Sequence, residues 1–224
     1  MAELSHWKPC DRPGKTGLTG LYAWLEPFSF HGHGEALYEA ICGADNDSLW
    51  HFIPAGPFTD ISEFRRLLDQ ANTALGWQTM VIRGAATSEV LGMASFMRIR
   101  EDHGSAEVGC VIFNRKLQCT RIATDAMYLM MRHIFHDLGY RRYEWKCDDA
   151  NEASKRAAVR FGFKYEGVFR NDMVVKGQNR DTAWFAVTDD DWPTIDAAFT
   201  AWLDPQNFDA FAAQRSKLLV PAFS

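Results

Sequence analysis

The chain has 224 residues, enough for one large domain, or one domain with terminal additions, that folds without a metal or disulfide. Hydrophobic residues make up 47% and charged residues 24%, as in an ordinary globular protein. The net charge of −5 leaves no surplus of cations to neutralise phosphates, which argues against a nucleic-acid partner. The sequence has neither the roughly 20-residue apolar run of a membrane span nor the apolar core of a signal peptide, so we expect a cytoplasmic protein without a membrane partner.

The five cysteines are widely spaced and form no CxxC pair, which predicts reduced thiols rather than disulfides or a zinc site. His31 and His33 stand in the segment FHGHG, but no acidic or cysteine partners follow them at ligand spacing. We therefore expect no metal and interpret FHGHG as a turn before a helix.

After a polar arm over residues 1–17, the first half of the chain alternates helical and strand patterns. The apolar stripe of residues 60–75, with Asp60 or Ser62 as its cap, is the clearest helical pattern. In chain order we expect a strand over 18–28 ending at Pro27, helices over 34–43 and 60–75, and an antiparallel hairpin of strands 77–84 and 90–100.

The second half begins with a strand over 106–113 and a strong helix over 121–140, closed by Gly139. A strand over 140–148 then precedes a short helix over 151–163, with Asn151 at its cap and Gly162 just past its end. The remaining elements are strands over 164–175 and 181–188 around the loop KGQNR, and a helix over 189–203 with Pro193 in its first turn.

This order predicts a mixed α/β fold: a mostly antiparallel sheet with helices on both faces, in one domain over 18–203. Residues 204–224 form a tail, which would pack either onto the body or onto another subunit. The apolar segment LLVPAF and the aromatics of AWLDPQNFDAF make a homodimer a reasonable hypothesis.

Four segments between Glu107 and Trp192 carry the functional signal: AEVGCVIF, RKLQCTRIATDAM, NEASKRAAVRFGFKYEG and KGQNRDTAWF. Their order and spacing resemble the GNAT superfamily, in particular its branch related to ribosomal-protein-alanine N-acetyltransferases. The resemblance covers about residues 18–203, and its most specific part is the NxxSxRAAxRFGFxxEG run. It implies a splayed sheet and the transfer of an acetyl or similar acyl group from acyl-CoA to a primary amine, on a small molecule or a peptide N-terminus.

The turn QCTRIAT opens the long helix, and the free N–H groups at a helix start are a natural receptor for a pyrophosphate. An ordinary helix start with a solvated basic turn is the structural alternative. The resemblance aligns Gln118, Arg121 and Ala123 with the family's phosphate-binding turn, but the family has glycine where this chain has Arg121. The arginine side chain would either crowd the turn or swing outward. The residues expected to contact the coenzyme here are Gln118, Cys119, Thr120, Arg121, Ile122, Ala123 and Thr124.

In the family, the strand EVGCVIF splays from its neighbour at a bulge and pairs with the pantetheine arm of the coenzyme. The resemblance assigns that pairing to Val111 and Phe113, places the bulge at Gly109, and makes an N–H near Cys110 or Val111 the donor to the thioester oxygen. A plain buried strand with one small residue is the structural alternative.

Glu107 is the best candidate for the general base, because an amine must lose a proton as it attacks. A solvent-facing carboxylate is the alternative, and Asp102, His103 and His136 are weaker candidates. By resemblance, Asn151 would bind the pantetheine arm besides capping its helix, and Ser154 would protonate the leaving thiolate.

Cys119 at a helix start also suits a nucleophile, but no histidine–acid pair serves it, and the family uses direct attack in a ternary complex. The leading hypothesis is thus an N-acyltransferase with acetyl-CoA or another acyl-CoA as cosubstrate. A protein that only binds or senses acyl-CoA, motivated by Arg121, and a scaffold that binds no coenzyme are the alternatives.

Overall fold

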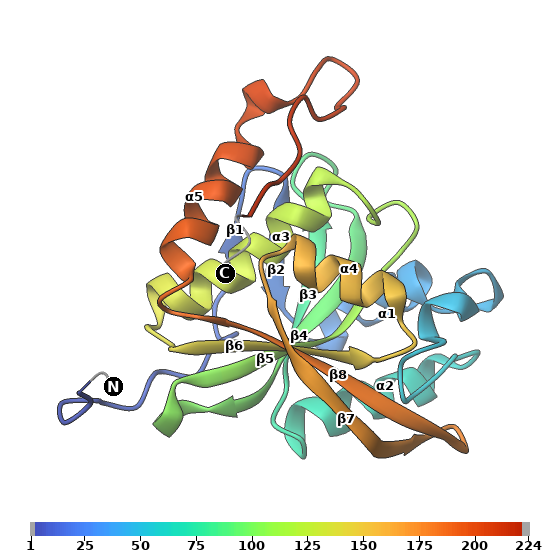
Figure 1. Cartoon of the computed structure of the whole chain (residues 1–224). Helices are drawn as coiled ribbons and strands as arrows, with labels where there is room; N and C mark the ends of the chain where they lie inside the picture. The colour runs from blue at the N-terminus through green and yellow to red at the C-terminus, as the bar shows by residue number, and fades with distance from the viewer. Residues whose placement is uncertain (1–2, 221–224) are drawn as a thin grey trace.

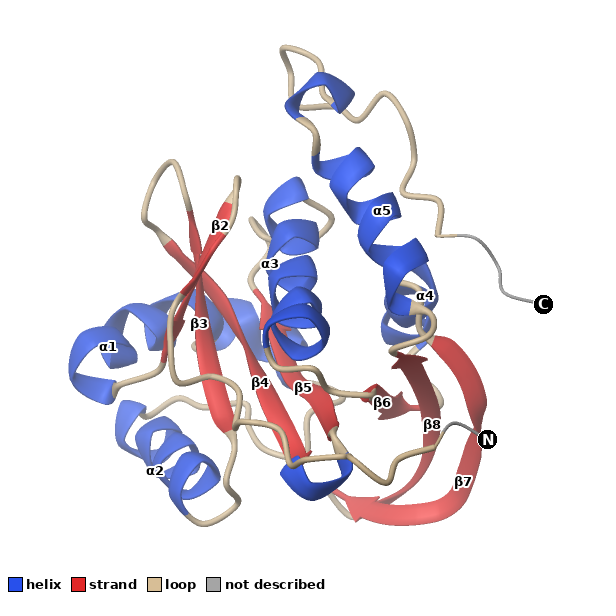
Figure 2. Cartoon of the chain, turned by 90° about the vertical axis from the view of Figure 1, so that its left-hand side faces the viewer, coloured by secondary structure: helices blue, strands red, loops and turns tan. Residues whose placement is uncertain are grey.

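The computed structural model describes residues 3–220 and places helices on both faces of one eight-stranded sheet (Figures 1 and 2). Every neighbouring pair of strands is antiparallel except β5 and β6, which are parallel. The expected mixed α/β fold with a mostly antiparallel sheet is therefore confirmed. In spatial order the strands are β1 (Leu18–Thr19), β2 (Ala23–Pro27), β3 (Gln78–Gly84), β4 (Val90–Arg100), β5 (Ser105–Phe113), β6 (Arg142–Asp148), β8 (Gln178–Thr188) and β7 (Lys164–Val175).

The sheet has a separate hydrophobic core on each face. On one face, strands β5, β6 and β8 pack against α3 (Arg121–Arg132), α4 (Glu152–Arg160) and α5 (Trp192–Leu203). On the other, β3 and β4 pack against α1 (Phe30–Ile41) and α2 (Ile61–Thr73), as Figure 2 shows. Each helix buries the apolar stripe visible in its sequence.

The helix starts follow the capping residues of the sequence. The Asp60 side chain accepts a hydrogen bond from the Ser62 N–H at 2.7 Å, and the Asn151 side chain accepts one from the Ser154 N–H at 3.0 Å. Both predicted caps are thus confirmed. After α3 the chain continues as a π-helical turn over His133–Asp137 and leaves it at Gly139, with φ of 69°.

Three predicted boundaries are wrong. The segment FHGHG lies inside α1, because Ser29 caps that helix and accepts a hydrogen bond from the Gly32 N–H at 3.2 Å. The strand expected over 18–28 is two strands, β1 and β2, separated at Gly20–Tyr22. The loop KGQNR shrinks to Lys176 and Gly177, whose φ angles of 51° and 76° fit the tight turn that joins two twisted strands.

Both terminal segments pack on the body within the described residues. In the polar arm, Arg12 pairs with Glu101 at 2.6 Å. In the tail, Phe208 and Leu218 are each only 8% exposed and join the core beneath α5. The apolar segment LLVPAF is thereby partly buried against its own chain, and its last three residues lie outside the described range. The homodimer and the boundaries at residues 17 and 203 stay predictions.

Candidate active site

The sheet opens between its two parallel strands. β5 pairs with β6 only over Ser105–Val108, opposite Arg142–Trp145, although both strands continue further. Beyond that point β6 stays paired with β8, and β5 stays paired with β4. The edge of β5 over residues 109–113 therefore faces β6 without pairing to it, which leaves backbone groups free for an extended ligand.

The bulge expected at Gly109 lies one residue later. Cys110 has a φ of 47°, and the register between β4 and β5 shifts so that Cys110 and Val111 together face Ala94. Gly109 has a packing role instead, since a Cβ atom there would lie 2.4 Å from the Met97 sulfur. Burial raises the pKa of the Cys110 thiol to about 12, so this cysteine stays neutral beside the opening.

The parallel direction of β5 and β6 brings two helix starts to one edge of the sheet, since α3 follows β5 and α4 follows β6 (Figure 1). The end of α4 also contacts the first turn of α3, because the Arg160 guanidinium donates to Thr124 Oγ1 at 3.1 Å. Thr120 caps α3 by accepting from the Ala123 N–H at 3.2 Å. Within the described part of the chain, the N–H groups of Arg121 and Ile122 have no acceptor, as the first turn of a helix requires.

The Arg121 side chain points out of this turn. Its guanidinium carbon lies 4.4 Å from the centre of the Tyr22 ring and 5.4 Å from that of Phe208. The residue with an unusual backbone is instead Cys119, whose φ is 60° and whose side chain is exposed. Of the two arrangements that the sequence left open, the structure shows the one in which the Arg121 side chain swings outward.

At the start of α4, Ser154 lies over β6. Its hydroxyl accepts a hydrogen bond from Trp145 Nε1 at 3.0 Å. Burial raises the pKa of the neighbouring Cys147 thiol, and a hydrogen bond with Ser154 partly opposes that rise. Asn151, one turn earlier, caps the helix, because its Oδ1 accepts the hydrogen bond from the Ser154 N–H. Both predicted residues therefore lie at the end of β6 that borders the opening.

A basic hollow lies along the later turns of α4, whose last residue, Arg160, contacts the first turn of α3. It is lined by Lys155, Arg156, Val159 and Arg160 from α4, together with Gln214, Lys217 and Leu218 from the tail. Arg115 and Lys116 lie elsewhere: Lys116 pairs with Glu89 at 2.6 Å, and both basic residues line a separate hollow beside α1. The tail contribution was not expected, because nothing in its sequence marks it as part of a site.

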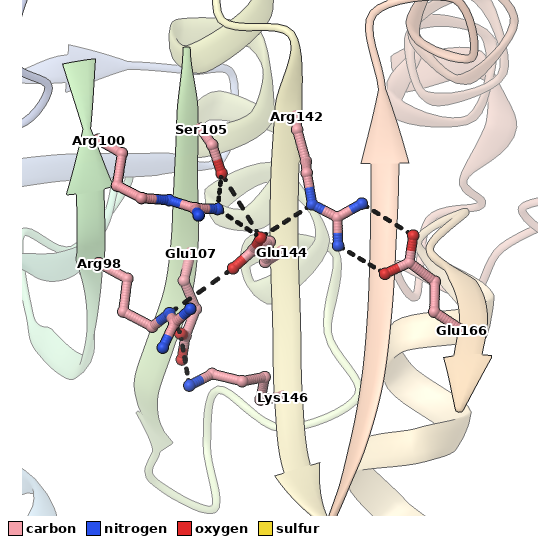
Figure 3. A network of polar contacts seen from close by, with 8 residues as sticks. All are labelled: Arg98, Arg100, Ser105, Glu107, Arg142, Glu144, Lys146 and Glu166. Carbon is pink, nitrogen blue, oxygen red and sulfur yellow. Dashed lines mark hydrogen bonds and ion pairs between the residues drawn. The ribbon is translucent and has the colours of Figure 1, made fainter. Parts of the chain in front are cut away.

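Glu107 is buried rather than solvent-facing, with 4% of its surface exposed. Its Oε2 lies 2.9 Å from Lys146 Nζ and 3.5 Å from Arg98 Nε (Figure 3). Across the strand pair stands Glu144, also buried, whose Oε1 accepts from Arg100 at 3.0 Å and Arg142 at 2.8 Å. The alternative acids and bases Asp102 and His103 sit in an exposed turn before β5.

Burial raises the pKa of the Glu107 carboxyl, although Lys146 and Arg98 oppose the shift and the Glu144 charge adds to it. A carboxylate whose pKa lies above its ordinary value is a better proton acceptor near neutral pH. The burial of Glu107 therefore favours the general-base hypothesis over an exposed surface carboxylate.

Sequence reasoning missed the charged partners of Glu107. A signal for two of them was present, since in RYEWKCD the polar residues Glu144 and Lys146 alternate with buried aromatics and so share one sheet face. Trp50 is fully buried in the core beneath α1 and donates to the Ile41 carbonyl at 2.7 Å.

Among the described residues, no helix is long and apolar enough to cross a membrane, and no three potential metal ligands gather.

Comparison with known proteins shows which family this chain belongs to. Residues 24–164 match the family model described as an acetyltransferase (GNAT) domain. A GCN5-related N-acetyltransferase from Brucella melitensis is similar, with 39% identity and a TM-score of 0.92 over 96% of this chain and 97% of that one. A probable GNAT-family acetyltransferase from Chromobacterium violaceum is 36% identical, with a TM-score of 0.81 over 86% and 96%.

The uncharacterized N-acetyltransferase p20 of Bacillus licheniformis is 27% identical over 58% of this chain and 75% of its own length. Spermidine N-acetyltransferase from Vibrio cholerae is 15% identical with a TM-score of 0.62, over 75% of this chain and 96% of that one. The Salmonella typhimurium acetyltransferase of ribosomal protein L7/L12 is 22% identical with a TM-score of 0.65, over 75% and 96%. These last two share the fold alone, so the ribosomal-protein branch stays a prediction. The family match and the close structural relatives show that this chain is an N-acetyltransferase of the GNAT superfamily.

Proposed function

We propose that the protein transfers an acetyl group from acetyl-CoA to a primary amine by direct attack within a ternary complex. The observation that carries this proposal is the opening between β5 and β6, which has helix starts at one end and the buried Glu107 beside its narrow end. A long, thin donor with a phosphate end and a thioester end matches that shape.

The donor would lie along the unpaired edge of β5, with Val111 and Phe113 offering backbone groups to its pantetheine arm. Its pyrophosphate would meet the free N–H groups at the start of α3, where the helix dipole favours anions. Lys155, Arg156 and Lys217 around the basic hollow would meet its outer phosphates. The Vibrio cholerae relative, which shares the fold, was solved with CoA and spermine.

Proximity and orientation would supply most of the rate gain, because both reactants are held in one site. Glu107 would accept the amine proton, directly or through water, as the nitrogen attacks the thioester carbonyl. A backbone N–H at the Cys110–Val111 bulge would stabilise the developing negative oxygen. Ser154 would donate a proton to the departing sulfur, which needs little help because a thiol has a pKa of about 8.5.

The acceptor is a small amine or a protein N-terminus in the distant relatives, as the names of the spermidine and ribosomal-protein enzymes state. Arg121 was the reason for the alternative hypothesis of a protein that only binds acyl-CoA, but its side chain turns away from the phosphate-binding turn. That alternative is therefore not favoured.

The test is thiol release from acetyl-CoA in the presence of primary amines. We expect Glu107→Gln to lower kcat/KM about 100-fold and Ser154→Ala to lower kcat by less than tenfold, each with unchanged coenzyme affinity. Native rates in both variants would contradict the assigned roles, and no thiol release with any amine would contradict the proposed function.

A further inference from the structure

The sheet face that carries Glu107 also carries a set of polar groups that the proposed reaction does not use. On β8, Arg180, Thr182 and Trp184 alternate with core residues and therefore share the face of Glu144 and Lys146 on the neighbouring strand. Arg180 Nε, Thr182 Oγ1 and Trp184 Nε1 are all buried and have no hydrogen-bond partner among the described residues. Buried polar atoms normally have a hydrogen-bond partner, so three such atoms on alternate residues of one strand indicate a missing partner.

Arg98 faces the same place from β4. Its guanidinium carbon lies 5.2 Å from the centre of the Trp184 ring, and its side chain is 46% exposed. The printed ion-pair contacts of Arg98 run from its Nε, at 3.5 Å from Glu107 and 3.7 Å from Glu144. Within residues 3–220 its side chain makes no hydrogen bond. The planar fork of its terminal nitrogens is free for a ligand.

The backbone at Arg98 is strained, with a φ of 44° where β4 and β5 lose register. Such a conformation is costly for a residue with a side chain and tends to occur at functional sites. At Arg98 this strained backbone occurs where the guanidinium lies beside Glu107, at the narrow end of the opening (Figure 3).

The unused groups are mainly hydrogen-bond donors, and the surrounding charge is positive. The carboxylates of Glu107 and Glu144 already face Lys146 and Arg98, at 2.9 and 3.7 Å. The drawn network contains four cations, Arg98, Arg100, Arg142 and Lys146, against the three anions Glu107, Glu144 and Glu166. Arg180 adds a further cation on β8, while the Asp148 carboxylate on β6 is engaged by the Ala150 N–H at 2.9 Å. The missing partner is therefore an acceptor of hydrogen bonds with negative charge.

Resting on the proposed function, we propose that the natural acceptor is a primary amine that also carries a carboxylate, and that Arg98 binds this carboxylate with help from the donors of β8. The amine then lies toward Glu107 and the opening between β5 and β6, while the rings of Trp184 and Phe169, 4.8 Å apart, contact its hydrocarbon part. Lys176 Nζ donates to the Trp50 carbonyl at 2.8 Å, which ties the β7–β8 turn to the segment after α1 and favours a small acceptor over a long peptide.

The experiment measures thiol release from acetyl-CoA with different acceptors: amino acids, their carboxamides and spermidine. Dipeptides with an acidic second residue are tested as well, as peptide acceptors. The native protein should prefer at least one amino acid over its own carboxamide by about tenfold or more in kcat/KM, and should use spermidine poorly. Arg98→Gln should raise KM for the carboxylate and abolish the preference, while the affinity for acetyl-CoA stays unchanged. Arg132→Gln removes an exposed arginine from α3 on the opposite side of the sheet and should leave the preference intact.

Equal rates with carboxylates and carboxamides, or a preference that survives Arg98→Gln, would overturn the inference while leaving the proposed function standing. Better turnover of the acidic dipeptides than of any free amino acid would overturn the small-molecule assignment. Coenzyme binding with no thiol release from any acceptor would instead contradict the proposed function itself, and with it this inference.

Discussion

At the scale of single residues, the proposed mechanism depends on how Glu107 is held. The carboxyl is buried between Lys146 and Arg98, and its desolvation raises its pKa while the two cations prevent a larger shift. A general base acts in its deprotonated form, so if Glu107 has this proposed role, activity falls as the pH drops through its raised pKa. The position of that fall reports the environment of Glu107.

We therefore expect kcat/KM to show an acidic limb with an apparent pKa above the usual carboxyl range. Glu107→Gln should remove this limb as well as lowering the rate, because the glutamine cannot titrate. A pH–rate profile of both proteins checks the prediction. A limb of unchanged position in the variant would assign the titration to another group.

Residue identity alone did not reveal this environment. Glu107 was recognisable as a candidate because it precedes the bulge strand, but its burial depends on Arg98 and Lys146, which come from other strands. The positive φ of Arg98 and Cys110 was likewise unpredictable, since neither is a glycine or asparagine. By contrast, the caps Asp60 and Asn151 were read correctly, because capping is a local interaction.

At the scale of elements, the tail is held to the body by one aromatic side chain above all. Phe208 packs edge-on against Tyr22 at 5.8 Å and Trp202 at 5.1 Å, and it also contacts the Arg121 guanidinium. It is 8% exposed, whereas the nearby Phe211 is 92% exposed. The tail sequence offered no periodicity from which this difference could be predicted.

Phe208→Ala should therefore lower the free energy of unfolding by about 3 kcal/mol, because it removes a buried ring and leaves a cavity. Phe211→Ala is the matched control and should change it by less than about 0.5 kcal/mol. Chemical denaturation measures both. Equal effects of the two substitutions would show that the tail does not pack as described.

The edge strand β7 is tied to the sheet by a two-pronged ion pair. Arg142 on β6 donates from Nη1 to Glu166 Oε1 at 2.8 Å and from Nη2 to Glu166 Oε2 at 2.5 Å. The hydrogen bonds from Arg142 hold the pKa of Glu166 below its ordinary value. A lowered pKa stabilises the fold above the unfolded-state pKa of about 4.3, and this contribution is lost as the pH falls through the folded-state pKa.

Accordingly, Glu166→Gln should reduce stability at neutral pH by about 1 kcal/mol or less, as the carboxylate is partly exposed. The difference from the native protein should begin to shrink as the pH falls below about 4.3 and should vanish once the pH is below the lowered folded-state pKa. Glu35→Gln, in which an exposed carboxylate of α1 is replaced, serves as the control and should change the free energy of unfolding at neutral pH by less than about 0.5 kcal/mol. A difference for Glu166→Gln that persists at low pH would mean that packing, not charge, is responsible.

At the scale of the whole molecule, the fold was predictable because its elements have strong local signals and a conventional order. Helical stripes and alternating strands gave the sheet and its two helical layers. The opening between β5 and β6 was expected only through the resemblance to the GNAT family, since no local pattern shows where Ser105–Val108 stops pairing with Arg142–Trp145. The charged face around Glu107 and the tail wall of the basic hollow depend on long-range packing, which no segment encodes alone.

The central claim is that acyl-CoA binds with its pyrophosphate on the start of α3, and calorimetric titration with acetyl-CoA tests it most directly. Arg121→Pro deletes one free N–H at the first helical position, where proline is tolerated and the extended backbone of Thr120 suits it. Arg121→Ala removes the same side chain but keeps the N–H. We predict micromolar binding by the native protein and the alanine variant, and about tenfold weaker binding by the proline variant. Absence of binding by the native protein, or equal binding by the two variants, would contradict the account.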